Sequence, residues 1–474
     1  MKATLEEKSA GFQVPVFALR REGSLGIGDV RAVYDMVDLA DSLGMRFLHL
    51  LPICETVKGN QVYQAISNLA VDPALLDTSP EGLEDLDEES FREALSEDEL
   101  EFDGDAIDYV MIKRLKLDLL WTAFSFFWKE HAEKMTERGE RFYAFCHAEE
   151  GWLSDYSSFR LLMDFEGGSE RWEDWSDEYG DREAALAYLR DICQEKSGEV
   201  EKQMAFYAYI QWVGRQQWRQ LKEYAELKGV AVIADVSLGV SQHSADFFHR
   251  NSSFDVNMDS GGSVKAMPRL GLEHWLERFN AQRQMFSGFR LLDLPELQSS
   301  APEDREHVVD HLKREFDDLL LVAGPGGSMK EGFRKKLQRA GIPPTVYLNG
   351  SYRESDMETL VANGIYGEPG LRDRWESDGS FRKQYDVKDR RKEVYGPETM
   401  LVLLEALFRH PGRMAMTTFG DLLGVRRSED DHWLARYPAS VNDMISNPSW
   451  HWFRREFRQM LISTGRLRGE VDPA

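Results

Sequence analysis

Cysteine is scarce in this chain, which has only Cys54, Cys146 and Cys193 among its 474 residues. The number is odd and no two of them have the C-x-x-C spacing, so the sequence predicts neither a disulfide framework nor a zinc knuckle. This scarcity is typical of proteins from a reducing compartment, and we therefore expect a cytoplasmic protein.

Positive charge is also in short supply. The chain has 58 Lys and Arg residues against 83 Asp and Glu residues, which gives a formal net charge of -25. Nucleic acids and anionic membranes both favour clustered Lys and Arg, so the sequence argues against either as a partner. No stretch approaches the roughly 18 apolar residues of a membrane span, and residues 1–11 are charged without an apolar run. A neutral polyol substrate remains compatible with this composition.

Short apolar segments alternate with helical stretches over much of the chain. One helical stretch, residues 30–43, follows Asp29 as a predicted N-cap and ends at Gly44 as a predicted C-cap. Strands joined through helices form parallel sheets, and eight such strands predict an α/β fold of the (β/α)8 TIM-barrel type. The eight predicted strands are residues 14–19, 47–51, 230–236, 289–294, 319–323, 345–348, 360–366 and 414–419.

Two acidic regions interrupt this alternation. Residues 78–108 contain Arg92 as their one basic residue, and residues 166–183 form a second acidic run. Such runs are typical of solvated surfaces, and helical segments lie between and after them. We therefore predict a barrel made of residues 1–77 and 197–474, with residues 78–196 as an acidic, largely helical insertion subdomain.

Two local patterns are similar to known binding motifs, one for metal ions and one for phosphate. His243, Asp246 and His249 are spaced so that one side of a short helix carries ligand-type side chains, but we favour a surface role over metal binding. The glycine-rich residues 324–327 lack the G-K-[ST] ending of a phosphate loop and are typical of a tight turn. We therefore expect no metal and no cofactor.

A series of short motifs resembles, in the same order, the amylomaltases, the 4-alpha-glucanotransferases that disproportionate α-1,4-glucans. The resemblance implies a (β/α)8 barrel with helical insertions and an α-glucan cleft at the carboxyl ends of the strands. It also implies a retaining double displacement, which needs two carboxyl groups about 5 to 5.5 Å apart. The matching segments are residues 26–29, 50–52, 63–67, 152–156, 211–218, 233–236, 419–424 and 450–452.

The position that this resemblance gives to the nucleophile holds a leucine. The family strand reads V-R-I-D-H-F, and the corresponding residues 289–294 match its arginine with Arg290 and its nucleophile with Leu292. Asp293 is adjacent, but side chains alternate between the faces of a strand, so it reaches the cleft only through a bulge.

The other two carboxylate positions are also unmatched. Gly324 stands where the resemblance places the general acid/base, and neither residues 347–352 nor residues 364–368 supply the His-Asp pair of the third carboxylate motif. The long family segment that crosses the acceptor side of the cleft has no counterpart between Asp255 and Arg269. Asp293, Glu296 and Glu368 remain as substitute carboxylates.

Three residues remain candidates for the cleft. Tyr63 matches a family tyrosine near the sugar-binding surface, where its ring either stacks on glucose or packs in the core. Asp235 matches a family aspartate and either faces the cleft or is held as a structural group. Arg290 needs a partner for its charge, and Asp235 and Asp293 are the candidates.

Three hypotheses follow. The first is a catalytically inactive member of α-glucan metabolism, which binds an α-1,4-glucan or maltooligosaccharide and acts in scaffolding or regulation, with another protein of that metabolism as a partner. The second is an active 4-alpha-glucanotransferase that uses relocated carboxylates. The third is a barrel-shaped interaction partner that binds no sugar.

Overall fold

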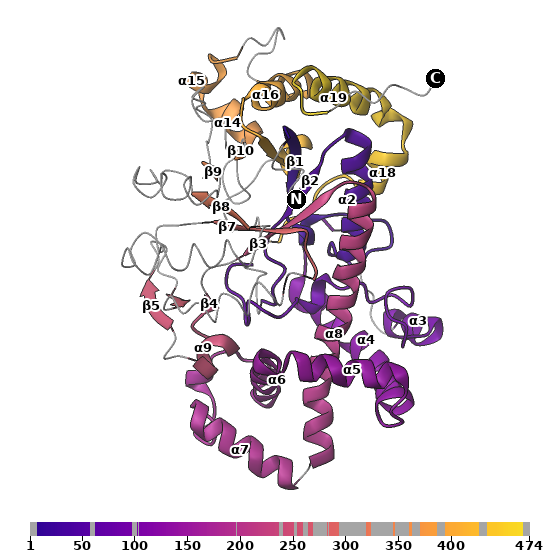
Figure 1. Ribbon diagram of the computed structural model, residues 1–474, viewed down its shortest axis with the longest axis vertical. Coiled ribbons are helices and arrows are strands. Elements are labelled where there is room, and N and C mark those ends of the chain that lie inside the picture. The colour runs from indigo at the N-terminus through magenta and orange to yellow at the C-terminus, as the bar shows by residue number, and fades with distance from the viewer. Residues whose placement is uncertain are drawn as a thin grey trace.

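The computed structural model describes most of the N-terminal half of the chain and shorter segments of the remainder (Figure 1). None of the helices in these ranges combines the length and apolar character that crossing a membrane requires. The described residues are 7–56, 62–96, 102, 104–195, 197–236, 240–250, 254–258, 264–268, 282, 284–292, 319–323, 345–346, 360–362, 370–385, 394–425 and 434–467.

Eight parallel strands form one sheet in the order β10-β11-β1-β2-β3-β7-β8-β9. Strands β9 and β10, at the two ends of this order, also contact each other. The predicted (β/α)8 barrel is therefore confirmed. Its strands are β1 (Ser9–Val14), β2 (Phe47–Leu50), β3 (Ala231–Val236), β7 (Gly288–Leu292), β8 (Leu319–Ala323), β9 (Thr345–Val346), β10 (Leu360–Ala362) and β11 (Met414–Thr418).

The first predicted strand, residues 14–19, was wrong. Strand β1 lies upstream, and Val16–Ala18 form a 3-10 turn instead. Pro15 has no N–H to donate to a neighbouring strand, so the ladder ends at Val14 although the apolar run continues. Both segments are fully buried, and an apolar pattern alone therefore does not separate them.

Helix α2 (Val30–Leu43) begins and ends where the sequence predicts. The Asp29 carboxylate accepts hydrogen bonds from the backbone N–H groups of Arg31 and Ala32, at 3.1 and 3.4 Å. Gly44 adopts a φ of 82°, a left-handed conformation that glycine takes without strain. On the outside of the barrel α2 packs along the long helix α8 (Ser197–Leu227).

Helices of the C-terminal part cover another side of the barrel. In Figure 1, α16 (Pro397–Arg409) and α19 (His451–Ser463) lie side by side near the end of the chain, and the two helices are in contact. The remaining short helices here are α14 (Leu371–Ser377), α15 (Gly379–Arg382), α17 (Phe419–Leu422) and α18 (Val441–Ser446).

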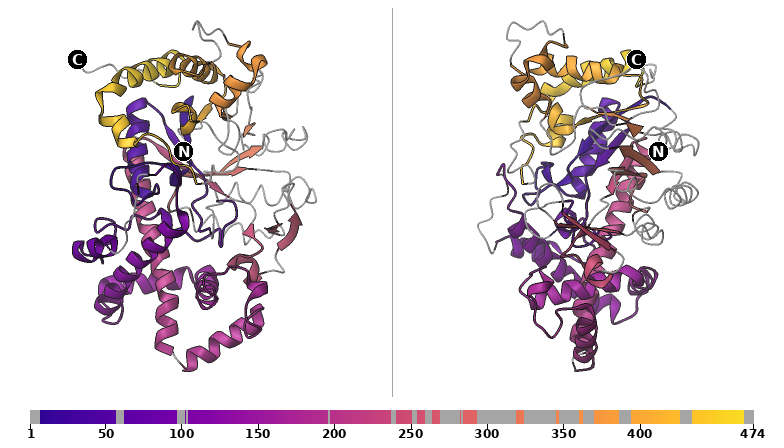
Figure 2. Two further views of the ribbon diagram at one scale, coloured as in Figure 1. Left: turned by 180° about the vertical axis from the view of Figure 1, so that it is seen from behind. Right: turned by 90° about the vertical axis from the view of Figure 1, so that its left-hand side faces the viewer.

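A group of helices lies between β2 and α8 in the sequence. Figures 1 and 2 show them gathered at one end of the molecule, away from α16 and α19. They are α3 (Glu88–Ser96), α4 (Tyr109–Phe127), α5 (Glu137–Ala148), α6 (Glu150–Phe165) and α7 (Arg182–Glu195). The division of the chain at residues 78 and 196 stays a prediction.

A small antiparallel sheet follows β3, and the sequence analysis missed it. Its strand order is β4-β6-β5, and the short helix α9 (Ala245–Arg250) connects β4 to β5. The strands are β4 (Val240–Ser241), β5 (Phe254–Met258) and β6 (Val264–Pro268). The Gly-Gly pair within residues 259–263 was the available hairpin signal.

The barrel strands have two chemically different faces. Phe12, Leu48 and Val232 are fully buried and belong to the main hydrophobic core, in which the strands pack against the surrounding helices. The alternate residues face the barrel interior. There Gly11 is packed so closely that a Cβ would lie 2.4 Å from the Phe47 ring, so the interior is tightly filled at this level.

Candidate functional site

Polar side chains occupy the interior face near the carboxyl ends of β1, β2 and β3. Gln13, His49 and Asp235 are each the last residue but one of their strands and are at most 3% exposed. Gln13 pairs in register with His49, and His49 pairs with Ile233, two residues before Asp235. All three therefore share one face of the sheet, at the end where barrel enzymes build their sites.

These side chains contact one another and a tyrosine from the loop that follows β2. The Gln13 amide lies 3.3 Å from Nδ1 of His49, and Nε2 of His49 lies 4.0 Å from Oδ2 of Asp235. The half-buried Tyr63 donates its hydroxyl hydrogen to the same Asp235 oxygen, at 3.0 Å. We call Gln13, His49, Tyr63 and Asp235 the mouth cluster.

The structure brings together Tyr63 and Asp235, two cleft candidates that are 172 residues apart in the sequence. The third candidate, Arg290, is in register with Asp235 on the neighbouring strand β7. Leu292, the predicted nucleophile position, ends β7 and pairs with Val322 of β8.

The roles assigned to these residues stay predictions. Asp293, Glu296, Gly324 and Glu368 lie outside the described residues.

Helix α9 holds the loop that carries Tyr63. The Asp246 carboxylate accepts hydrogen bonds from the Ser67 hydroxyl at 2.8 Å and from the Asn68 backbone N–H at 3.0 Å. His249, on the same helix, lies 3.1 Å from the Ser158 hydroxyl of α6. The mouth cluster therefore depends on α9 through this loop.

The surface role expected for Asp246 and His249 was wrong, because they are only 9% and 4% exposed. Their hydrogen bonds to α6 and to the loop explain this burial. His243 has a different neighbour, Glu173, at 3.2 Å. Over the part of the chain that the structure describes, no group of three or more His, Cys, Asp or Glu side chains is arranged to hold a metal ion.

A buried ionic network also contacts the loop that follows β2. Glu55 is fully buried and forms ion pairs with Lys113 of α4 at 2.8 Å and with Arg160 of α6 at 3.1 Å. Burial alone would raise the pKa of Glu55, but the charges of Arg160 and Lys113 outweigh it and keep that pKa below its usual value. Burial raises the pKa of the neighbouring Asp72, which accepts a hydrogen bond from Tyr109. The network anchors the loop to the helical region.

The mouth cluster combines groups that suit a polyhydroxyl ligand. A carboxylate, an imidazole and an amide can exchange hydrogen bonds with sugar hydroxyls, and the Tyr63 ring offers an apolar face.

Sequence analysis missed Gln13 and His49. His49 stands alone in the otherwise apolar segment 47–51, and Gln13 lies just before the misplaced first strand. A polar residue in an apolar barrel strand was the signal that could have found His49, and it would have found Gln13 only with the first strand placed at residues 9–14.

The sequence profile of a family described as 4-alpha-glucanotransferase matches residues 14–271 of this chain. This span contains the whole mouth cluster except Gln13 and ends before β7.

Individual relatives carry the same description. The chain is 26% identical to the 4-alpha-glucanotransferase of Clostridium butyricum, over 50% of this chain and 46% of that protein. It is 27% identical to the one of Synechocystis sp., over 56% and 55% of the two chains. It is 29% identical to the one of Thermus thermophilus, over 68% of each. The match thus spans about half the length of the first two relatives.

Solved structures support the fold independently. The amylomaltase from Streptococcus agalactiae in complex with acarbose has a TM-score of 0.77 at 19% identity, covering 98% of this chain and 100% of that one. The amylomaltase from Corynebacterium glutamicum has a TM-score of 0.71 at 16% identity, covering 98% and 76%. At these identities the likeness establishes the fold alone.

Proposed function

This chain belongs to the 4-alpha-glucanotransferase family, and we propose that it binds α-1,4-glucans at the barrel mouth without transferring them. The relatives named above are 4-alpha-glucanotransferases, and one structural neighbour was solved with acarbose bound. Those properties belong to the relatives. For this chain the proposal depends on its own residues at the corresponding end of the barrel.

The observation that carries the proposal is the end of strand β7. Leu292 is its last residue and lies two positions beyond Arg290, which is in register with Asp235. The family resemblance puts the nucleophile at this position. A retaining transfer forms a covalent bond between a carboxylate and the sugar, and a leucine side chain provides no atom that can form it.

The sequence at the second catalytic position supports the same conclusion. Gly324 stands at the general acid/base position of the family motif. Without a proton donor there, the leaving oxygen of the glycosidic bond must depart as an alkoxide, which is a far slower reaction. The loss of both groups removes both halves of the double displacement.

The mouth cluster supports the binding half of the proposal. Asp235 is 3% exposed, and Tyr63 reaches it from a loop held by Asp246 and the buried Glu55 network. Such side chains, fixed before the ligand arrives, lose little conformational entropy on binding. A glucan-binding protein of this kind acts in the cytoplasm as a scaffold or regulator, together with another protein of glucan metabolism.

The test is to incubate the purified chain with maltotriose and to separate the products by chain length. We expect unchanged maltotriose. The proposal fails if glucose and longer maltooligosaccharides accumulate and this activity disappears in Asp293→Asn, Glu296→Gln or Glu368→Gln, because relocated carboxylates would then be working. The binding half of the proposal fails if calorimetry detects no binding of maltoheptaose. The barrel would then serve protein contacts alone.

A further inference from the structure

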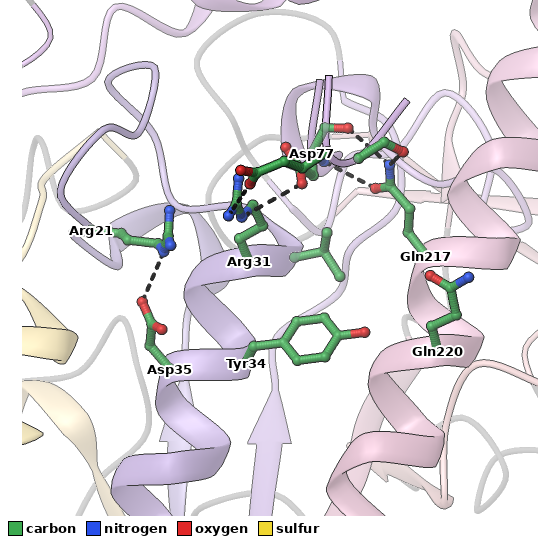
Figure 3. Close-up of a pocket in the computed structure, with 10 residues that line it drawn as sticks. Arg21, Arg31, Tyr34, Asp35, Asp77, Gln217 and Gln220 are labelled. Atoms are coloured by element: carbon green, nitrogen blue, oxygen red, sulfur yellow. Dashed lines mark hydrogen bonds and ion pairs between the residues drawn. The ribbon is translucent and has the colours of Figure 1, made fainter. Parts of the chain in front are cut away.

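A second recess lies outside the barrel, between helices α2 and α8 (Figure 3). Its volume is about 380 Å³, within the range of roughly 300 to 1,000 Å³ that is usual for small-molecule sites. Tyr34 projects from α2 and Gln220 from α8, and in Figure 3 the Tyr34 side chain points across the recess toward α8. We call this recess the α2–α8 pocket.

One wall of the pocket is built rigidly. Gln217 of α8 donates its amide hydrogens to the backbone carbonyls of Asp77 and Gly82, at 2.8 and 3.0 Å. Its carbonyl oxygen accepts a hydrogen bond from the Asp77 backbone N–H at 3.0 Å. Three hydrogen bonds from one buried side chain thus fix residues 77–82 against α8 before any ligand arrives.

The charged groups of the pocket are already paired. Arg31 lies 3.6 Å from the Asp77 carboxylate and also forms an ion pair with Glu81, while Arg21 pairs with Asp35 at 3.0 Å. Burial, together with the nearby charge of Asp29, raises the pKa of Asp77. With two arginines against three acidic side chains, the lining has no excess positive charge to attract a phosphate or carboxylate ligand.

Two polar groups of the lining are uncommitted. Neither the Tyr34 hydroxyl nor the Gln220 amide has a hydrogen-bond partner among the described residues. The Tyr34 ring lies beside the Tyr224 ring, with centroids 5.0 Å apart, and this contact holds it in place on α2. The pocket therefore presents an aromatic ring, a free amide and paired ionic groups within one small volume.

We infer that the α2–α8 pocket is a second binding site, which takes a short neutral sugar such as maltose. Paired carboxylates and guanidinium groups can bridge adjacent sugar hydroxyls without leaving a buried charge unbalanced, and an aromatic ring packs against the C–H face of a pyranose. The paired charges disfavour an anion, and the aromatic ring beside a hydroxyl and an amide suits a polyol. The choice of a glucose-based sugar rests on the proposed function.

The test is hydrogen exchange of the whole chain with and without maltose, combined with calorimetric titration. We expect maltose to slow exchange in residues 30–35 and 77–82, which line the pocket. Tyr34→Phe should weaken this binding several-fold and Tyr34→Ala combined with Gln220→Ala at least ten-fold. Tyr143→Ala, a change of a 37% exposed tyrosine on α5, serves as the matched control and should leave it unchanged.

Two results would overturn the inference. One is maltose protection of these segments that persists in the double variant. The other is binding of inorganic phosphate with no binding of maltose, which would make the site an anion site. An Asp235→Asn variant separates this inference from the proposed function, because it disables the barrel mouth and should leave protection of the α2–α8 pocket intact.

Discussion

The two ends of the barrel differ in their polar contacts, which join a side chain to the backbone at the amino end and join side chains to one another at the carboxyl end. At the amino end, Arg466 is 2% exposed, and within the described residues its guanidinium group donates to backbone carbonyls alone. These five acceptors are the carbonyls of Ser9, Phe408, His410, Gly412 and Arg413, at 2.7 to 3.0 Å. At the carboxyl end, the mouth cluster consists of side chains that contact one another, with a half-buried tyrosine over them.

We relate this difference to two roles: the contacts at the amino end stabilise the fold, and those at the carboxyl end belong to the proposed binding site. Arg466 joins the start of β1 to the segment before β11, and burial lowers its pKa to about 10, so the group stays charged at neutral pH. The mouth cluster instead holds groups that can exchange partners with a ligand. In barrel proteins the amino end serves stability and the carboxyl end serves function, and the function that we propose for this chain requires the same division.

The largest expected effect is at the amino end. Arg466→Met removes five hydrogen bonds to backbone carbonyls, of which the Arg413 carbonyl keeps a second donor, the Ser9 N–H. Hydrogen bonds from a charged donor each contribute about 1.5 to 3 kcal/mol. We expect the free energy of unfolding, measured in urea, to fall by at least about 4 kcal/mol. Binding of maltoheptaose by the folded fraction should not change.

The control is Arg458→Met on helix α19, which ends three residues before Arg466. Among the described residues, its half-buried guanidinium contacts the carbonyls of Asp41 and Ser42 alone. Its effect should be far smaller. Equal losses in the two variants would contradict the special role of Arg466.

A smaller effect on stability, confined to acidic pH, is expected from His249 on helix α9. Burial lowers the pKa of His249 to about 4, against a partial opposing effect of Asp155. The unfolded chain takes up this proton near pH 6.5 and the folded chain only near pH 4, so stability is present above pH 6.5 and falls as the pH drops through this window. The full loss is about 3 kcal/mol for this shift.

The measurement is the urea midpoint of wild type and His249→Gln at several pH values. The variant should lack this part of the pH dependence. Parallel curves for the two proteins would show that His249 does not titrate as described. Because α9 holds the loop of Tyr63 through Asp246, maltoheptaose binding should weaken over the same pH range.

The smallest expected effect is on binding alone. Tyr63→Phe keeps the ring and removes the hydroxyl that is bonded to Asp235 and that we expect to reach a sugar. Loss of one hydrogen bond to the ligand, about 1 kcal/mol, would give roughly five-fold weaker binding of maltoheptaose by calorimetry. The free energy of unfolding should fall by no more than about 1 kcal/mol, the contribution of the one internal hydrogen bond that is lost. Tyr143→Phe, on helix α5, is the control. A large loss of stability without a change in affinity would assign Tyr63 to packing.

Sequence patterns correctly predicted elements whose ends are determined by neighbouring residues. Helix α2 was predicted with both ends because Asp29 and Gly44 act on their own neighbours. The first strand was misplaced because Pro15 interrupts an apolar run whose two halves are equally buried. Whether such a run is strand or turn is decided by which backbone groups find partners on β2 and β11, and that information is not local.

The candidate site could be predicted only in part, because its contacts also join residues that are distant in the sequence. Family motifs pointed to Tyr63 and Asp235, but their contact joins residues 172 apart. Gln13 and His49 were missed because their strands were identified by apolar character, and the interior face of a barrel is defined only when neighbouring strands are in register. The buried roles of Asp246 and His249 likewise depend on a loop and a helix distant in sequence.

The central claim is that the barrel mouth binds an α-1,4-glucan and leaves it unchanged. The direct measurement is equilibrium dialysis of the chain against maltoheptaose, followed by mass analysis of the sugar recovered from the protein. We predict that maltoheptaose is retained at full length, and that Asp235→Asn reduces the retained amount. Recovery of a ladder of shorter and longer maltooligosaccharides, or no retention by the wild-type chain, would contradict the account.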